Sequence, residues 1–244
     1  MQKYFISKDK LNQCIIDTDD AFHISTVMRS KIGDEILVSD EERCVLAKIT
    51  SIAKDKVTFE IIEELKANNE LPVKVTIFQG YPKGDKLEEI IKHSTELGAY
   101  AFVPTIMKRS LFKLDPKKKE SKLERFRKIA KEASEQSFRL IIPKVIDILS
   151  LKEIDFKAYD KLILCYEESS KTGDLVNFKG IVKSLKKDDR VAVLIGPEGG
   201  IDEAELKYLE SIGFIACGLG PRILRTETAA SYVLSSISYE MELK

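Results

Sequence analysis

The chain has 244 residues, of which 43% are hydrophobic and 33% charged, and its 40 basic and 40 acidic residues give a formal net charge of zero. This length and composition are typical of an ordinary globular protein with one large domain or two smaller ones. The neutral balance argues against a general polycationic nucleic-acid binder, although it permits a local basic patch.

Membrane and secretion signals are not evident in the sequence. No apolar run approaches the roughly 18 residues that a membrane-spanning helix needs, and the opening "MQKYFISKDKLNQ" lacks the apolar region of a secretion signal. The four cysteines lie far apart without a C-x-x-C pair, and there are only two histidines. We therefore expect a cytoplasmic protein without disulfides or a metal.

The first 65 residues are predicted to be rich in β-strands. Short runs enriched in valine, isoleucine and threonine occur at 35–40, 43–52 and 56–65, which suits a small barrel or sandwich. The segment "KANNELP" (66–72) then loses the apolar pattern and ends in proline. We place the domain boundary there, with a first domain at 1–68 and a second at 72–244.

Strands and helices alternate beyond this boundary. The expected strands are at 73–80, 100–104, 161–166, 191–196 and 214–220. The expected helices are within 85–98, from the basic stretch to about 137, at 202–211, and from about 226 onward. Such alternation predicts an α/β domain with a mostly parallel sheet and helices on both faces.

Positive charge is concentrated in the middle of the chain. Residues 113–128 hold eight basic and three acidic residues, a net of +5, whereas residues 1–70 hold ten basic and fourteen acidic, a net of −4. Three of the nine arginines, Arg125, Arg127 and Arg139, fall in or just after this basic stretch. A solvated helix face and an RNA-contacting surface both explain the pattern, and both remain open here.

Two glycine-containing turns follow predicted strands, in "LIGPEGGIDEAE" (194–205) and "LGPRILRTETAA" (219–230). Ligands of open α/β sheets bind at the carboxyl ends of strands, and glycine allows close backbone approach. Asp202 can cap the helix that follows the first turn. Neither turn fits the dinucleotide or P-loop glycine pattern, so those sites are disfavoured. Tight turns without a ligand are the alternative.

These motifs resemble the RsmE family, the 16S ribosomal RNA uracil-N3 methyltransferases of the SPOUT superfamily. The resemblance rests on "IGPEGG" and "LGPRILRTETA", and extends to "HISTVMRSKIGDEI", "YPKGDKLEEIIKHSTELG" and "EASEQSFR" in the same order. It implies a PUA-like β-barrel at 1–68, which would serve as an RNA-binding accessory. It also implies a SPOUT domain with a trefoil knot at 72–244, an exception to the rule that folds are unknotted.

The resemblance further implies a cofactor, S-adenosyl-L-methionine, held by the two glycine turns, and a homodimer. The implied cofactor-binding residues are Gly196, Pro197, Glu198, Gly199, Gly200, Leu219, Gly220, Ile223 and Leu224. Small residues on the last helix, Ala229, Ala230, Ser235 and Ser236, would allow close packing against a partner, although a helix that faces the core has the same pattern.

For catalysis, a fixed guanidinium could stabilise the negative charge that spreads over the uracil oxygens when N3 loses its proton. Arg225 is the first candidate, Arg222 the second, and Glu227 the candidate base. Alternatively, each arginine pairs with a carboxylate such as Glu227 or Glu198.

The 16S ribosomal RNA, free or within the small ribosomal subunit, is the implied partner, and its target base must be unpaired or flipped out. The candidate phosphate contacts are Arg125, Arg127, Lys128, Arg139, Lys83 and Lys86, with a local patch of Lys3, Arg29 and Lys31 in the first domain. Two other functions remain open: a SPOUT methyltransferase of another RNA such as tRNA, and a non-catalytic RNA-binding or ribosome-assembly module.

Overall fold

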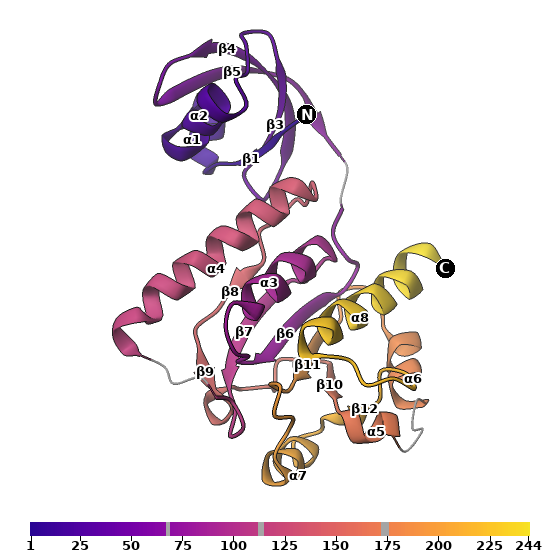
Figure 1. Ribbon diagram of the computed structural model, residues 1–244. Coiled ribbons are helices and arrows are strands. Elements are labelled where there is room, and N and C mark those ends of the chain that lie inside the picture. The colour runs from indigo at the N-terminus through magenta and orange to yellow at the C-terminus, as the bar shows by residue number, and fades with distance from the viewer. Residues whose placement is uncertain (67–68, 112–114, 172–175) are drawn as a thin grey trace. The chain divides into compact units, whose positions relative to one another are not determined.

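The computed structural model describes residues 1–66, 69–111, 115–171 and 176–244 (Figure 1). The chain divides into two compact units. One contains Met1–Glu70 together with Ser134–Ile142, and the other contains Leu71–Ala133 together with Pro143–Lys244. The first unit thus includes a short segment, 134–142, that the sequence assigns to the second domain. Residues 67–68 of the expected boundary, and Lys113 and Leu114 of the basic stretch, lie outside the described residues.

The N-terminal unit is built on a five-stranded sheet with the strand order β1-β3-β4-β5-β2. The strands are β1 (Lys3–Phe5), β2 (Ile15–Asp17), β3 (Glu35–Ser39), β4 (Cys44–Ile52) and β5 (Lys56–Leu65). Strands β1 and β3 are parallel, and the other pairs are antiparallel. Three short helices, α1 (Lys8–Gln13), α2 (Thr18–Phe22) and the π-helical η1 (His23–Val27), supply Leu11 and Ile24 to its buried core.

The segment 134–142 is attached to this unit through Arg139, which is only 2% exposed. Its guanidinium pairs with Glu70, and one oxygen of Glu70 also accepts the backbone N–H of Leu140 at 2.9 Å. Lys3, likewise buried, donates to the backbone carbonyl of Arg139. Arg139 and Lys3, which the sequence predicts as phosphate contacts, are thus buried and paired within the N-terminal unit, so we do not include them among the proposed RNA contacts.

The C-terminal unit contains a seven-stranded sheet in which every pairing is parallel. The strand order is β12-β10-β11-β6-β7-β8, and β9 pairs with β7. The strands are β6 (Lys74–Gly80), β7 (Ala101–Ile106), β8 (Lys144–Val145), β9 (Leu149–Ser150), β10 (Lys161–Cys165), β11 (Arg190–Ile195) and β12 (Ile215–Cys217). Because the strands are parallel, their carboxyl ends meet at one edge of the sheet.

Helices pack around this sheet. The helices are α3 (Lys86–Glu96), α4 (Pro116–Gln136), the short 3₁₀ helix η2 (Leu151–Glu153), α5 (Glu167–Lys171), α6 (Val176–Ser184), α7 (Glu203–Ser211), α8 (Thr226–Ser238) and the π-helical η3 (Tyr239–Leu243). Helices α3 and α8 lie side by side, and α8 also contacts β11 (Figure 1). A buried hydrophobic cluster of this unit contains Phe78 of β6 together with Phe156 and Phe214, and the ring centroids of Phe78 and Phe156 lie 4.9 Å apart.

The structure confirms the α/β fold with a small β-rich N-terminal unit. The sequence missed elements of two or three residues such as β1, β2, β8 and β9, because so few residues show no periodicity. The trefoil knot stays a prediction, since strand order does not define how the chain is threaded. None of the described helices has the length and the apolar character that crossing a bilayer requires.

Candidate functional site

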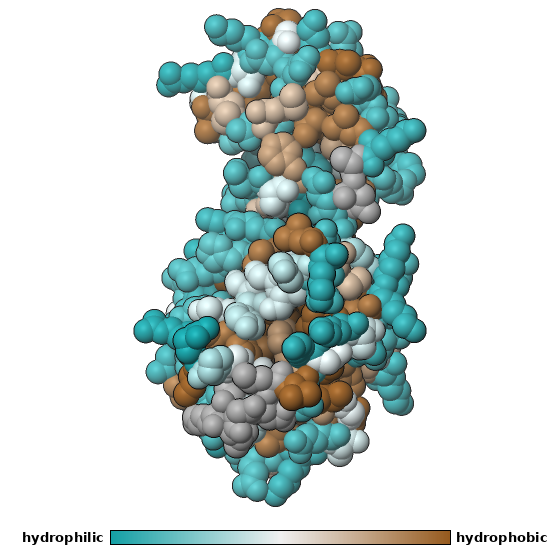
Figure 2. Space-filling view, turned by 90° about the vertical axis from the view of Figure 1, so that its right-hand side faces the viewer, coloured by the Kyte–Doolittle hydropathy of each residue, from teal (hydrophilic) through white to brown (hydrophobic). Residues whose placement is uncertain are grey.

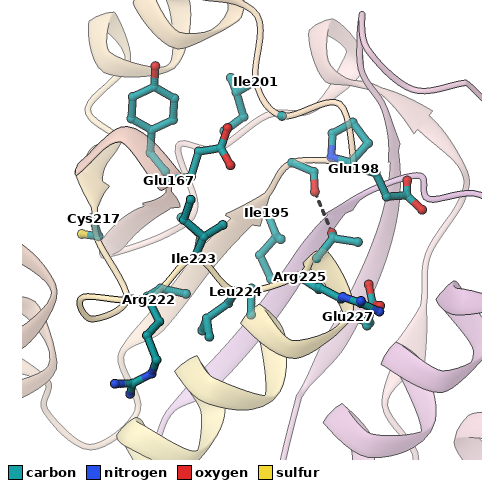
Figure 3. A pocket seen from close by; sticks show the side chains of 18 of the residues that line it. Glu167, Ile195, Glu198, Ile201, Cys217, Arg222, Ile223, Leu224, Arg225 and Glu227 are labelled. Atoms are coloured by element: carbon teal, nitrogen blue, oxygen red, sulfur yellow. Dashed lines mark hydrogen bonds between the residues drawn. The ribbon is translucent and has the colours of Figure 1, made fainter. Parts of the chain in front are cut away.

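A cavity of about 380 Å³ lies in the C-terminal unit, at the carboxyl ends of β10, β11 and β12 and the start of α8 (Figure 3). This volume falls within the range of roughly 300–1,000 Å³ for small-molecule sites. Its lining residues are Lys86, Cys165, Tyr166, Glu167, Ile195, Gly196, Pro197, Glu198, Gly200, Ile201, Cys217, Leu219, Arg222, Ile223, Leu224, Arg225, Thr226, Glu227 and Ala229. The two glycine turns of the sequence thus form one site.

Glycines allow the first turn, 196–200, to lie close against the end of β6. A Cβ on Gly80, the last residue of β6, would lie 2.5 Å from the backbone nitrogen of Pro197. A Cβ on Gly196 would lie 2.9 Å from Cγ1 of Ile201. Gly200 adopts φ +73°, and Asp202 caps α7 by accepting the backbone N–H of Ala204. These close approaches explain why glycine is required here.

A hydrogen-bond chain joins this turn to the start of α8. The hydroxyl of Thr226 donates to the carbonyl of Gly196 at 2.7 Å, as drawn in Figure 3, and accepts from Nε2 of Gln79 at 2.8 Å. Gln79 is 1% exposed. Sequence reasoning missed both residues, although a glutamine in an apolar strand, "VKVTIFQG", is a signal of a polar contact at the strand end.

The cavity has apolar walls and carboxylates on two sides. Ile195, Ile201 and Leu219 are buried, and Leu224 is half-buried beside them. Glu167 is exposed and lines the cavity from the start of α5. In Figure 3, Glu167 lies on one side of the pocket, and Glu198 and Glu227 lie on the other. Such an arrangement can hold a flat apolar group together with hydroxyl or amine donors.

The strand end at β10 contributes residues that the sequence analysis did not propose: Cys165, Tyr166 and Glu167. Cys165 and Cys217 are register partners on β10 and β12. Burial raises the pKa of the Cys165 thiol, which keeps it protonated. The motif "KLILCYEE" could have pointed to this part of the site, since ligand sites in parallel sheets use several neighbouring strand ends.

A lysine between two carboxylates is the main charged feature of the cavity. Nζ of Lys86 lies 3.1 Å from Oε1 of Glu198 and 3.5 Å from Oε2 of Glu227. The hydrogen bond to Glu198 and the nearby charge of Glu227 raise the pKa of Lys86. Burial alone would raise the pKa of Glu198, but hydrogen bonds from the backbone and from Lys86 lower it overall. Both groups are therefore charged at neutral pH.

Arg222 and Arg225 both line the cavity and are exposed. Within the described part of the chain, neither guanidinium forms an ion pair or a hydrogen bond, so pairing with Glu198 or Glu227 is not observed. In Figure 3 the two side chains extend to different sides of the pocket, with Arg225 on the side of Glu227. Arg225 also immediately precedes α8, and its backbone carbonyl accepts the backbone N–H of Thr228 at 2.9 Å.

Two of the expected cofactor residues do not line the cavity. The carbonyl of Gly199 accepts Nη1 of Arg109 at 3.1 Å, and a Cβ on Gly199 would meet the Arg109 backbone oxygen at the same distance. Gly220 adopts φ +106°, and its Cβ would approach the hydroxyl of Tyr232 at 3.5 Å. Both glycines thus lie against other parts of the protein and outside the cavity lining. The remaining seven expected residues are at the cavity surface.

The candidate RNA contacts of α4 are on the surface and carry acidic neighbours. Arg125 pairs with Glu88 and Arg127 with Glu120, each at 2.7 Å, and Lys128 lies 3.9 Å from Glu132. Lys83 is exposed, and its backbone N–H donates to Glu198. Arg29 and Lys31 are exposed in the N-terminal unit. Exposed pairs contribute little to stability, so these side chains remain able to exchange an acidic partner for a phosphate.

No group of three or more histidine, cysteine, aspartate or glutamate side chains suited to a metal ion occurs among the residues that the structure describes. The site is thus built from backbone turns, apolar walls and the charged groups described above. With its position at the carboxyl edge of a parallel sheet, this arrangement defines a small-molecule site of an α/β enzyme.

Comparison with protein families identifies the class of protein. Residues 69–238 match an RNA methyltransferase domain, and residues 16–62 match an RNA methyltransferase PUA domain. Among curated relatives, ribosomal RNA small subunit methyltransferase E of Bacillus subtilis is 46% identical over 254 aligned residues, which cover 100% of this chain and 98% of that protein. The Synechocystis protein of the same name is 32% identical, covering 93% of this chain and 73% of its own length. The chain belongs to the ribosomal RNA small subunit methyltransferase E family.

Solved structures agree with this assignment. A ribosomal RNA small subunit methyltransferase E from Neisseria gonorrhoeae, bound to S-adenosyl methionine, superposes with a TM-score of 0.82 at 27% identity, covering 98% of this chain and 97% of that chain. A methyltransferase from Legionella pneumophila, in complex with the same cofactor, gives 0.78 at 29% identity, with 92% and 90% covered. These comparisons confirm the fold class and the family that the sequence motifs indicate.

Proposed function

We propose that this protein transfers a methyl group from S-adenosylmethionine to N3 of a uridine in 16S ribosomal RNA. The 46% identity over the full chain to a ribosomal RNA small subunit methyltransferase E supports the reaction class and the RNA. The observation that carries the proposal for this chain is the cavity, in which Arg225, Glu227 and Lys86 meet the two glycine turns. N3 methylation is the part inferred from the motifs, and the experiment below tests it.

The residues of the cavity fit S-adenosylmethionine. The cradle of Gly196 and Gly200 lets the backbone approach a ligand closely, and the apolar surface of Ile195, Ile201 and Leu219 suits an adenine ring. Glu167 offers a carboxylate to hydroxyl or amine donors. The cofactor supplies a methyl group on a positively charged sulfur. We assign its binding to the seven expected residues at the cavity surface: Gly196, Pro197, Glu198, Gly200, Leu219, Ile223 and Leu224.

Arg225 and Glu227 are assigned to the reacting base. Uracil N3 is a poor nucleophile until it loses its proton, and the resulting charge spreads to O2 and O4. An unpaired guanidinium at the cavity can stabilise that charge, which gives Arg225 the catalytic role, with Arg222 as the second candidate. Glu227 carries the nearby carboxylate that can accept the N3 proton.

The RNA is proposed to reach the site across positively charged side chains. Arg125, Arg127 and Lys128 are 64%, 48% and 71% exposed at their side chains. Lys83 precedes α3, which begins at the cavity, and Arg29 is exposed in the N-terminal unit. These groups can contact phosphates, whereas base recognition requires an unpaired or flipped nucleotide. Because the proposed substrate is ribosomal RNA, we also propose a cytoplasmic location.

A homodimer through α8 is also proposed, but it rests on other residues than the sequence suggested. Ala229 and Ala230 are buried within the protein, so they do not form the expected small-residue surface. Of the other two expected small residues, Ser235 is exposed and Ser236 is half-buried. The exposed large hydrophobic side chains of this region are Tyr232, Tyr239 and Leu243, which are 37%, 61% and 77% exposed. Figure 2 shows pale and brown side chains gathered on the C-terminal unit. Light scattering of the full chain at micromolar concentration should give the mass of two chains, and a monomer mass contradicts this proposal.

The test of function is the methylated nucleotide itself. Mass-spectrometric mapping of ribosomal RNA from cells with and without the gene should show one N3-methylated uridine that depends on the gene. A methylated tRNA instead would identify another RNA substrate. Cofactor binding without any modified nucleotide would favour a non-catalytic module.

A pair of variants then assigns the catalytic arginine. Arg225→Ala should lower the single-turnover rate by about two to three powers of ten, as does loss of an oxyanion-hole donor, with cofactor affinity nearly intact. Arg225→Lys should recover only part of the rate because it lacks the planar fork. If Arg225→Ala loses only cofactor affinity, Arg225 is a cavity wall and Arg222 takes the role.

A further inference from the structure

Lys86 occupies an unusual position for a side chain expected on an RNA-contacting surface. It is the first residue of α3, it lines the cavity, and its side chain is 36% exposed. Its ammonium lies between Glu198, from the turn after β11, and Glu227, from the first turn of α8. One cation therefore connects three separate elements of the site.

The two oxygens of Glu227 are in different environments. Oε2 is shielded from solvent, makes no hydrogen bond among the described residues, and lies 3.5 Å from the Lys86 ammonium. The side chain as a whole is still 21% exposed, so that exposure falls on its other atoms. Glu227 has no other ion pair within the described chain. The arrangement covers one carboxylate oxygen with a cation and leaves the other free to accept a proton.

Glu198 fixes the lysine in place. Both carboxylate oxygens of Glu198 accept the backbone N–H of Lys83, at 3.1 and 3.3 Å. Two carboxylates close to each other repel, and a cation between them offsets this repulsion. Glu198 is thus hydrogen-bonded to the backbone of Lys83, and Lys86 forms ion pairs with both Glu198 and Glu227.

We propose that Lys86 is a positioning residue that orients the Glu227 carboxylate for proton removal from uracil N3. This inference rests on the proposed function and deepens it. The N3–H bond breaks and its proton goes to Glu227. The N3 electron pair forms the new bond to the methyl carbon, and the electron pair of the methyl–sulfur bond stays on sulfur. The positive charge of the sulfonium and the negative charge of the carboxylate are both lost, so the step balances.

The rival role for Lys86 is a phosphate contact, and three variants separate the two roles. Lys86→Met removes the charge and keeps most of the chain length. Lys86→Arg keeps a cation that can still bridge the carboxylates. Lys92→Met is the matched control, because Lys92 is an exposed lysine on the same helix, outside the cavity. Thermal unfolding of each variant checks that the fold is retained.

The measurements are the single-turnover methyl-transfer rate at saturating cofactor and RNA, the RNA affinity against salt, and the cofactor affinity by calorimetry. Lys86→Met should lower the rate by about ten- to a hundredfold, part of the effect of a general base. Raising the pH should recover much of the loss because more uracil is then already ionised. Lys86→Arg should recover most of the rate at neutral pH, and Lys92→Met should match the native protein.

Two results would overturn the inference. One is a native single-turnover rate in Lys86→Met. The other is a loss that comes entirely from RNA affinity, with a salt slope smaller by about one unit, as expected for one phosphate contact. Native protein that binds cofactor but never methylates N3 of uridine overturns the proposed function as well. Native activity with an unaffected Lys86→Met variant overturns only the role of Lys86.

Discussion

Gly80→Ala is the substitution for which the structure gives the sharpest expectation. The new Cβ would lie 2.5 Å from the backbone nitrogen of Pro197, 2.6 Å from its Cδ and 2.8 Å from the carbonyl carbon of Gly196. These neighbours are backbone and ring atoms, so no flexible side chain can turn away. The first glycine turn must therefore move away from the end of β6.

The size of the effect follows from the distances. Non-bonded carbon atoms prefer separations of about 3.5–4.0 Å, so the turn has to shift by about 1 Å. Overpacking of this kind typically costs about 1–3 kcal/mol. We expect the free energy of unfolding of the C-terminal unit to fall by that amount. Because the turn forms a wall of the cavity, the dissociation constant for S-adenosylmethionine should rise about tenfold or more, and a tenfold rise corresponds to about 1.4 kcal/mol.

Gly180→Ala is the matched control, with the opposite sign. Gly180 lies inside α6, and a Cβ there meets no atom within 4 Å. Alanine in a helix interior is more stable than glycine by about 0.5–1 kcal/mol. Denaturant unfolding and calorimetric titration of S-adenosylmethionine measure both variants. A Gly80→Ala variant that unfolds and binds cofactor as the native protein does would contradict this expectation.

Three further predictions concern hydrogen bonds, charge and RNA. Thr226→Val should reduce stability by about 1–3 kcal/mol because it leaves buried partners unsatisfied, whereas Thr226→Ser and the exposed-site control Thr228→Val should change denaturant unfolding much less. Hydrogen bonds from Lys108 and from the backbone of Ala204 hold the pKa of Asp202 below 3.8. This stabilisation is present above that pH and is lost as pH falls through the folded pKa, so acid titration of unfolding should show the advantage over Asp202→Asn disappearing below about pH 4. Replacing three exposed cations of α4 together should flatten the log-log salt dependence of RNA affinity by about two to three units, and an unchanged slope would mean that α4 is only a solvated face. Those three are Arg125, Arg127 and Lys128.

The sequence by itself determined the α/β class, most longer strands and helices, and the two glycine turns of the cavity. Apolar runs such as "VAVLIG" are buried on both faces of a parallel sheet, so their hydrophobicity is continuous and easily recognised. Turn glycines are also readable, since few other residues allow such close backbone approach. The motif that contains Arg225 and Glu227 placed both residues at the cavity for the same local reason.

Tertiary structure alone decided which charges meet. The sequence marks Lys86 only as a candidate RNA contact and does not show that it bridges Glu198 and Glu227, whereas Lys92 on the same helix is exposed. Likewise, Arg139 follows a basic stretch of the sequence and is expected at the surface, but it is buried and paired with Glu70, 69 residues earlier. Burial and ion pairing are set by contacts between elements far apart in the chain. Periodicity reports only which face of an element is apolar, so it cannot reveal these partners.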